Sequence, residues 1–81
     1  MTASDIRQAL TSILIESFSV DAAAVIPEAT FEDLGLDSLD VVSFVMALED
    51  RLRVEIPETD LQEVETIGDA VALLERKMAV A

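Results

Sequence analysis

The chain has 81 residues, enough for one domain but not for a second hydrophobic core. It contains no Cys, His, Tyr or Trp, so it lacks a disulfide framework, a thiolate metal site and the usual general base of hydrolases. Its 17 acidic and 5 basic residues give a net charge of −12, which disfavours nucleic acid and anionic membranes and favours basic protein surfaces as partners. We therefore expect a binding protein rather than an independent enzyme.

Residues 3 to 18 are predicted to form an amphipathic helix. Thr2 and Asp5 match the spacing of a capping box, in which a hydroxyl and a carboxylate satisfy the first backbone N–H groups of a helix. The apolar residues that follow recur at helical spacing. They are Ile6, Leu10, Ile13, Leu14 and Phe18.

Residues 19 to 37 show no sustained periodicity and are predicted to form a long loop with one or two short turns. This stretch contains residues that are typical of turns and helix caps. They are Pro27 and Gly35, and the cap-like Asp21 and Thr30. A loop of this length is uncommon in a compact domain and is often functional. We expect its apolar residues to hold it against the core. These are Val25, Ile26, Phe31, Leu34 and Leu36.

Three further helices are predicted. One begins at residues 37–38 and ends at 52 or 53, a brief one follows Pro57 from Glu58 to about Val64, and the last ends near residue 78. Thr66 and Asp69 repeat the capping-box spacing before the last helix. The predicted fold is a single all-α domain over residues 1–81, a largely antiparallel four-helix bundle with one short helix and a long first loop.

No apolar run approaches the roughly 18 residues needed to cross a bilayer, and the N-terminus lacks the basic and apolar stretches of a secretion signal. We therefore expect a monomeric cytoplasmic protein without stable membrane insertion.

The helix that begins at residues 37–38 has two apolar faces. At about 100° per residue, one face forms an ordinary core stripe within a sector of about 100°. This stripe contains Val41, Phe44, Val45, Leu48 and Leu52. Leu39, Val42 and Met46 form a second group about 120° away. Three interpretations are open: the bundle wraps this helix more fully, a few exposed apolar residues have no function, or the second face is an apolar strip for partner proteins.

Ser38 alone fits a common structural role, because Ser before an apolar run is a standard helix N-cap. The wider stretch carries more information. Leu34-Gly35-Leu36-Asp37-Ser38-Leu39-Asp40, then Val45-Met46-Ala47-Leu48-Glu49 and Val54-Glu55-Ile56-Pro57, resembles the discrete, type II acyl carrier proteins. The resemblance is continuous from about Phe31 to Leu74 and covers the whole chain in looser form.

The resemblance implies a covalent cofactor. In that family the Ser of the Asp-Ser-Leu motif carries 4′-phosphopantetheine, derived from coenzyme A, through a phosphodiester. The motif falls on Asp37, Ser38 and Leu39 here. A phosphodiester at the start of a helix meets free backbone N–H groups and the positive end of the helix dipole. The thiol of the arm would carry acyl groups as thioesters to separate enzymes, and no metal site is implied.

The resemblance also implies partners and a docking face. The partners are a phosphopantetheinyl transferase and acyl-transferring, ketosynthase and other enzymes of fatty acid or polyketide biosynthesis that have basic docking patches. The residues expected to meet them, besides those of the Asp-Ser-Leu motif, are Asp40, Val42, Met46, Glu49 and Asp50.

Family members can shelter the acyl chain among their helices. The candidates for lining such a cavity are Val45, Leu48, Ile56, Leu61 and Ile67, for each of which plain core packing is an equal interpretation.

Three positions depart from many fatty-acid carriers. Ser43 stands where an acid is common on the docking face, and Arg51 and Arg53 replace acids at the end of that helix. These departures leave room for a specialised pathway.

An acidic helical interaction module without a cofactor is the competing hypothesis. A calcium-binding EF-hand is excluded, because no twelve-residue window has its ligand spacing, although the acidic surface leaves open a loosely bound divalent cation.

Overall fold

Helices make up most of residues 3–78, the part of the chain that the computed structural model describes, and no strand occurs among these residues. In chain order the elements are α1 (Ala3–Phe18), the 3₁₀ helix η1 (Ala22–Ala24), α2 (Ser38–Leu52), α3 (Glu58–Leu61) and α4 (Ile67–Met78). This confirms the predicted all-α bundle with one short helix and a long first loop.

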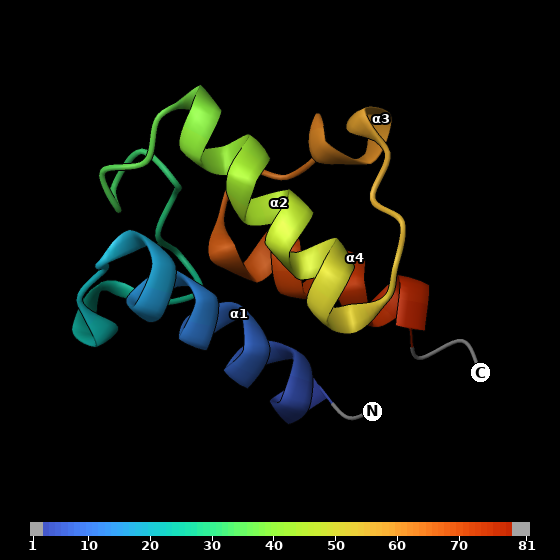
Figure 1. Cartoon of the computed structure of the whole chain (residues 1–81), viewed down its shortest axis with the longest axis horizontal. Helices are drawn as coiled ribbons and strands as arrows, with labels where there is room; N and C mark the ends of the chain where they lie inside the picture. Colours follow the sequence, from blue (N-terminus) through green and yellow to red (C-terminus); the bar gives the residue numbers. More distant parts are fainter. Residues whose placement is uncertain (1–2, 79–81) are drawn as a thin grey trace.

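The three long helices lie roughly along one common axis, and α1 runs antiparallel to both α2 and α4 (Figure 1). α1 packs against both of these helices. The start of α1 and the ends of α2 and α4 lie at one end of the bundle, and α2 begins at the opposite end, next to the long loop (Figure 1). Ser38 is therefore at the far end of the molecule from the end of α4.

The core centres on Phe44 in α2, whose side chain is 1% exposed. Its ring meets the Phe18 ring edge-on with centroids 6.2 Å apart and the Phe31 ring at a tilt with centroids 5.7 Å apart. Aromatic pairs at these separations add to the burial of apolar surface. The three rings come from α1, the first loop and α2, so they join the loop that precedes Ser38 to the core.

The first loop is pinned to the core largely as predicted. Leu36 is buried, and Val25, Phe31 and Leu34 pack partly buried against the core. Ile26 is different, because its side chain is 47% exposed. The chain turns tightly here, with the Ile26 N–H donating to the Ala24 carbonyl and the Ala29 N–H donating to the Ile26 carbonyl, both at 3.0 Å, and Ile26 lies on the outside of these turns. The buried Val20 and Ala29, which the sequence analysis did not single out, complete the attachment.

The helix boundaries follow local capping. Thr66 and Asp69 form the predicted box before α4: the Asp69 N–H donates to Thr66 Oγ1 (3.1 Å), and the Thr66 N–H donates to Asp69 Oδ2 (3.2 Å). α3 is shorter than predicted, since it ends at Leu61 and the chain continues to Val64 through tighter three-residue turns. The predicted cap at Thr2 lies outside the described residues.

Candidate functional site

The start of α2 is fixed by two aspartates. Asp37 is the N-cap, with extended backbone (φ −94°, ψ −175°). Its Oδ1 accepts the Asp40 N–H at 2.9 Å, and Asp40 Oδ2 accepts the Asp37 N–H at 3.2 Å. The interpretation of Ser38 as the cap is therefore wrong, because Asp37 already performs that function. Ser38 is the first helical residue, and its side chain is exposed.

Two features of the preceding loop place Ser38 at this position. Gly35 has φ +79°, a left-handed conformation that side-chain-bearing residues rarely adopt. The turn is closed by the Gly35 N–H, which donates to the Glu32 carbonyl at 2.9 Å, and by the Leu36 N–H, which donates to the Phe31 carbonyl at 3.0 Å. Leu36 is then buried, so the chain is anchored two residues before Ser38 emerges at the surface.

The loop also contains a reciprocal pair that the sequence analysis recognised only in part. The Thr30 N–H donates to Asp33 Oδ2, and the Asp33 N–H donates to Thr30 Oγ1, both at 3.0 Å. Thr30 additionally forms an isolated antiparallel β-bridge with Thr66. These contacts attach the loop to the segment before α4 and stiffen the approach to Ser38.

The surroundings of Ser38 suit a covalently attached phosphate. The Asp40 N–H is occupied by the capping box, whereas the N–H groups of Ser38 and Leu39 have no hydrogen bond within residues 3–78. Free N–H groups at the start of a helix stabilise an anion. The carboxylates of Asp37 and Asp40 oppose this attraction, so a phosphate here needs a covalent bond to stay.

The second apolar face of α2 is exposed, as the docking interpretation requires. Leu39 is 77% exposed, Val42 53% and Met46 63%. The residues of the core stripe are instead buried or, at Val41, half-buried. Because Leu39 directly follows Ser38, this strip begins beside the candidate attachment point. The alternative in which the bundle wraps α2 on both faces is therefore wrong.

The predicted docking carboxylates differ in their surroundings. Asp50 is exposed. Asp40 also serves in the capping box, and Glu49 is half-buried with Oε2 accepting the Ile56 N–H at 2.9 Å. This last contact spans the loop between α2 and α3, and nothing in the spacing of the sequence reveals it.

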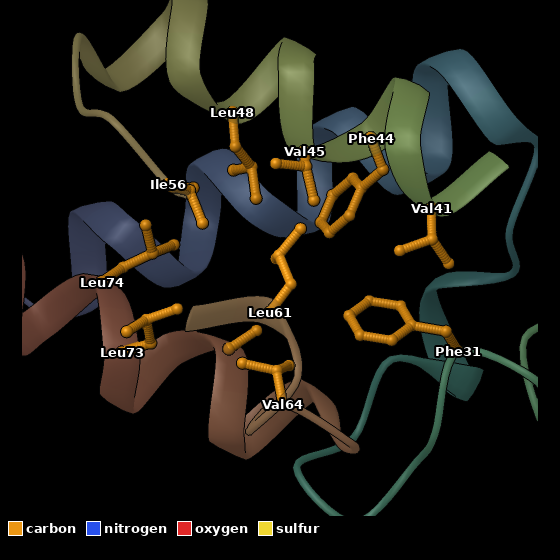
Figure 2. Close-up of a pocket in the computed structure, with 11 residues that line it drawn as sticks. Phe31, Val41, Phe44, Val45, Leu48, Ile56, Leu61, Val64, Leu73 and Leu74 are labelled. Carbon is orange, nitrogen blue, oxygen red and sulfur yellow. The ribbon is translucent and has the colours of Figure 1, made fainter. Parts of the chain in front are cut away.

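A small apolar cavity of about 60 Å³ lies between α2, the short α3 segment and α4 (Figure 2). Val45, Leu48, Ile56 and Leu61 line it as predicted, with the Leu61 side chain near its middle. Ile67 does not line it, because it faces a separate hollow between α1, the first loop and α4. The sequence analysis missed other lining residues. They are Phe31, Val41, Phe44, Val64, Ala70, Leu73 and Leu74.

An open groove of about 510 Å³ runs outside this cavity. Its walls include Val42 and Met46 from the exposed strip of α2 and Gln62 beyond α3. Three further residues, Val45, Ile56 and Leu61, line both the groove and the cavity and so form the wall between them. Val42 lies one helical turn after Ser38, so the groove begins close to the exposed hydroxyl.

Among the described residues, no three His, Cys, Asp or Glu side chains gather as a metal-binding group. Within residues 3–78, no helix has the length and apolar character needed to span a bilayer.

One comparison with known protein families bears on this geometry. The family model described as a phosphopantetheine attachment site matches residues 8–74, a span that runs from the first turns of α1 to α4 and contains Ser38.

Proposed function

The chain belongs to the phosphopantetheine attachment site family, and we propose that Ser38 is the residue to which its arm is attached. Members of this family carry covalently bound 4′-phosphopantetheine. The observation that carries the assignment is the exposed Ser38 hydroxyl at the start of α2, left out of the capping box by Asp37. Ser38 Oγ would form the new bond to phosphorus and lose its proton, while the nucleotide part of coenzyme A departs.

We propose that the whole chain is one carrier domain that serves separate enzymes. When the arm is bound, its thiol supplies a site for an acyl thioester. The protein itself contributes position, because a tethered substrate reaches a high effective concentration once the carrier docks. Weak and rapidly exchanging contacts are then sufficient for transfer, and the protein needs no catalytic residue of its own.

The exposed strip of Leu39, Val42 and Met46, with Asp50 beside it, is the proposed docking surface. Apolar side chains lose water on contact, and nearby carboxylates steer a basic partner into register. The partners we propose are a phosphopantetheinyl transferase and the acyl-transferring and ketosynthase enzymes of fatty acid or polyketide biosynthesis, all in the cytoplasm. The Ser43 side chain is exposed on α2 and uncharged, which favours partners that place no base opposite it.

The apolar cavity is the proposed shelter for the acyl chain. A volume of about 60 Å³ is well below the roughly 150 Å³ of an apolar cavity that holds a benzene molecule. An acyl chain therefore enters only if Leu61 moves from the middle of the cavity. α3 contains no fully buried residue, which supports such a movement.

Enzymatic loading tests the carrier function. The chain is incubated with coenzyme A and a phosphopantetheinyl transferase, and then with an acyl donor and a transferring enzyme. We expect intact-mass spectrometry to show an acyl adduct that hydroxylamine removes, because a thioester is labile to this nucleophile. A chain that takes up no arm from several transferases would instead support the cofactor-free interaction module.

A further inference from the structure

Met46 places a thioether on the proposed docking surface. Its side chain is 63% exposed, and it lies on α2 between Val42 one turn before it and Asp50 one turn after it. It also lines the open groove outside the apolar cavity. The other methionine among the described residues is Met78, which is half-buried and packs against the core. Met46 is therefore the more accessible of these two thioethers.

The chain contains no Cys, so the methionine thioethers are the only sulfur groups among its side chains. A peroxide converts a thioether into a sulfoxide, which turns a flexible apolar side chain into a polar one. Hydrogen peroxide transfers one oxygen atom to the sulfur; the sulfur is oxidised and the peroxide is reduced to water. Because exposure favours this reaction, Met46 should be oxidised before Met78.

The fold does not depend on the apolar character of Met46. The core stripe lies on another face of α2, where Phe44 is 1% and Leu48 2% exposed. Oxidation of Met46 therefore alters the docking surface and leaves the core packing unchanged. In the free chain the sulfoxide oxygen accepts hydrogen bonds from water, and an apolar patch of a partner that covers it removes this water. The sulfoxide should thus weaken docking without unfolding the protein.

We propose, on the premise of the carrier function above, that Met46 is a reversible oxidation site that controls docking. As a thioether it makes an apolar and adaptable contact with partner enzymes. As a sulfoxide it brings an unsatisfied oxygen into that contact, and the complex dissociates more readily. A methionine sulfoxide reductase reverses the change: two thiols supply the electrons and become a disulfide, and the oxygen leaves as water.

Limited peroxide treatment of the chain without its arm tests the site, because the thiol of the arm would compete for the oxidant. Peptide mapping by mass spectrometry should show that Met46 gains an oxygen atom sooner than Met78. Circular dichroism should give the same helix content and Tm before and after treatment.

Binding to a phosphopantetheinyl transferase, titrated without coenzyme A, measures the consequence. We expect the oxidised chain to bind about tenfold more weakly, the effect of one acceptor left unsatisfied in an interface. Incubation with a methionine sulfoxide reductase and dithiothreitol should restore the original affinity.

Three variants assign the loss of affinity to Met46. Met46→Leu keeps an apolar side chain that peroxide does not oxidise, so it should bind as the reduced wild type does, before and after treatment. Met46→Gln places a neutral polar side chain of similar length in the strip and should bind about tenfold more weakly without peroxide. Met78→Leu retains Met46 and should respond to peroxide as wild type does.

The inference would be overturned by oxidation of Met78 ahead of Met46, by an oxidised chain that binds as tightly as the reduced one, or by an equal loss of affinity in Met46→Leu. A fall in Tm that accompanies the loss would also overturn it, because unfolding would then explain the weaker binding. Each of these failures leaves the attachment of the arm at Ser38 standing. A reduced chain that binds no transferase would instead overturn the docking surface, and this inference with it.

Discussion

Asp37 and Asp40 each accept the other's backbone N–H at the start of α2, at 2.9 and 3.2 Å, and Ser38 lies between them outside this pair of hydrogen bonds. The arrangement separates two tasks that one residue often combines. Asp37 starts the helix, and the Ser38 hydroxyl stays exposed for chemistry. A change at Ser38 should therefore affect modification without affecting the fold.

Replacing Asp37 tests this division directly. Asp37→Ala should lower the free energy of unfolding by about 1 kcal/mol, the usual cost of losing an N-cap side chain. For a domain of this size that corresponds to a fall in Tm of about 4–8 °C. Ser38→Ala should leave Tm nearly unchanged. Thermal unfolding followed by circular dichroism measures both, and a larger loss for Ser38→Ala would contradict the assignment of the cap.

The two faces of α2 offer a matched pair of leucines. Leu48 is 2% exposed and Leu39 is 77% exposed. Leu48→Ala should cost about 2–5 kcal/mol, because it leaves a cavity in the core. Leu39→Ala should change stability by no more than about 0.5 kcal/mol. Leu39→Ala should nevertheless weaken binding to a phosphopantetheinyl transferase in a titration, and unchanged affinity would remove Leu39 from the docking surface.

Steering by acids is best tested at Asp50. Asp40 and Glu49 also accept backbone hydrogen bonds, so their reversal would mix docking with local structure. Asp50→Lys should slow association with a basic partner in stopped-flow measurements, and the loss should shrink as salt is raised. Glu16→Lys makes the same charge change on α1 and should have a smaller effect. A loss independent of salt would argue against steering.

Asp69 gives the fold a defined pH dependence. The backbone N–H groups of Glu65 and Thr66 donate to its carboxylate and lower the pKa of Asp69. A carboxyl whose pKa is lower in the folded state stabilises the fold above its unfolded pKa, and this stabilisation is lost as pH falls through the folded value. Asp69→Asn should therefore be less stable than wild type at pH 7.

The difference between Asp69→Asn and wild type should shrink as the pH falls below about 4. Urea unfolding at several pH values measures this difference. Glu63→Gln removes one exposed carboxylate that accepts no hydrogen bond within the described residues, and it should show little of the effect. A constant gap between Asp69→Asn and wild type across the pH range would contradict the role of the two N–H donors.

Local signals account for the parts of the fold that could be predicted from sequence. Capping boxes need only residues three apart, so the spacing at Thr66 and Asp69 predicted the start of α4. Apolar periodicity likewise separated the buried Phe44 from the exposed Met46 on α2. The Asp-Ser-Leu motif predicts Ser38 as the attachment residue, and the structure adds that Asp37 is the N-cap of α2.

Features that depend on contacts between distant segments were not predictable in this way. Ile67 is apolar like the residues that line the cavity, yet it lines the separate hollow between α1, the first loop and α4. The hydrogen bond from Ile56 to Glu49 crosses the loop after α2 and has no pattern in the sequence. The orientation of Ile26 similarly depends on where the loop meets the core.

The identity of the attachment residue is settled by intact-mass spectrometry after incubation with coenzyme A and a phosphopantetheinyl transferase. Wild type and Ser43→Ala, which removes another exposed serine of α2, should each gain one phosphopantetheine unit. Ser38→Ala should gain none while retaining the circular dichroism spectrum of the folded chain. A folded Ser38→Ala chain that still gains the unit, or a wild-type chain that gains nothing with several transferases, would contradict the assignment of Ser38.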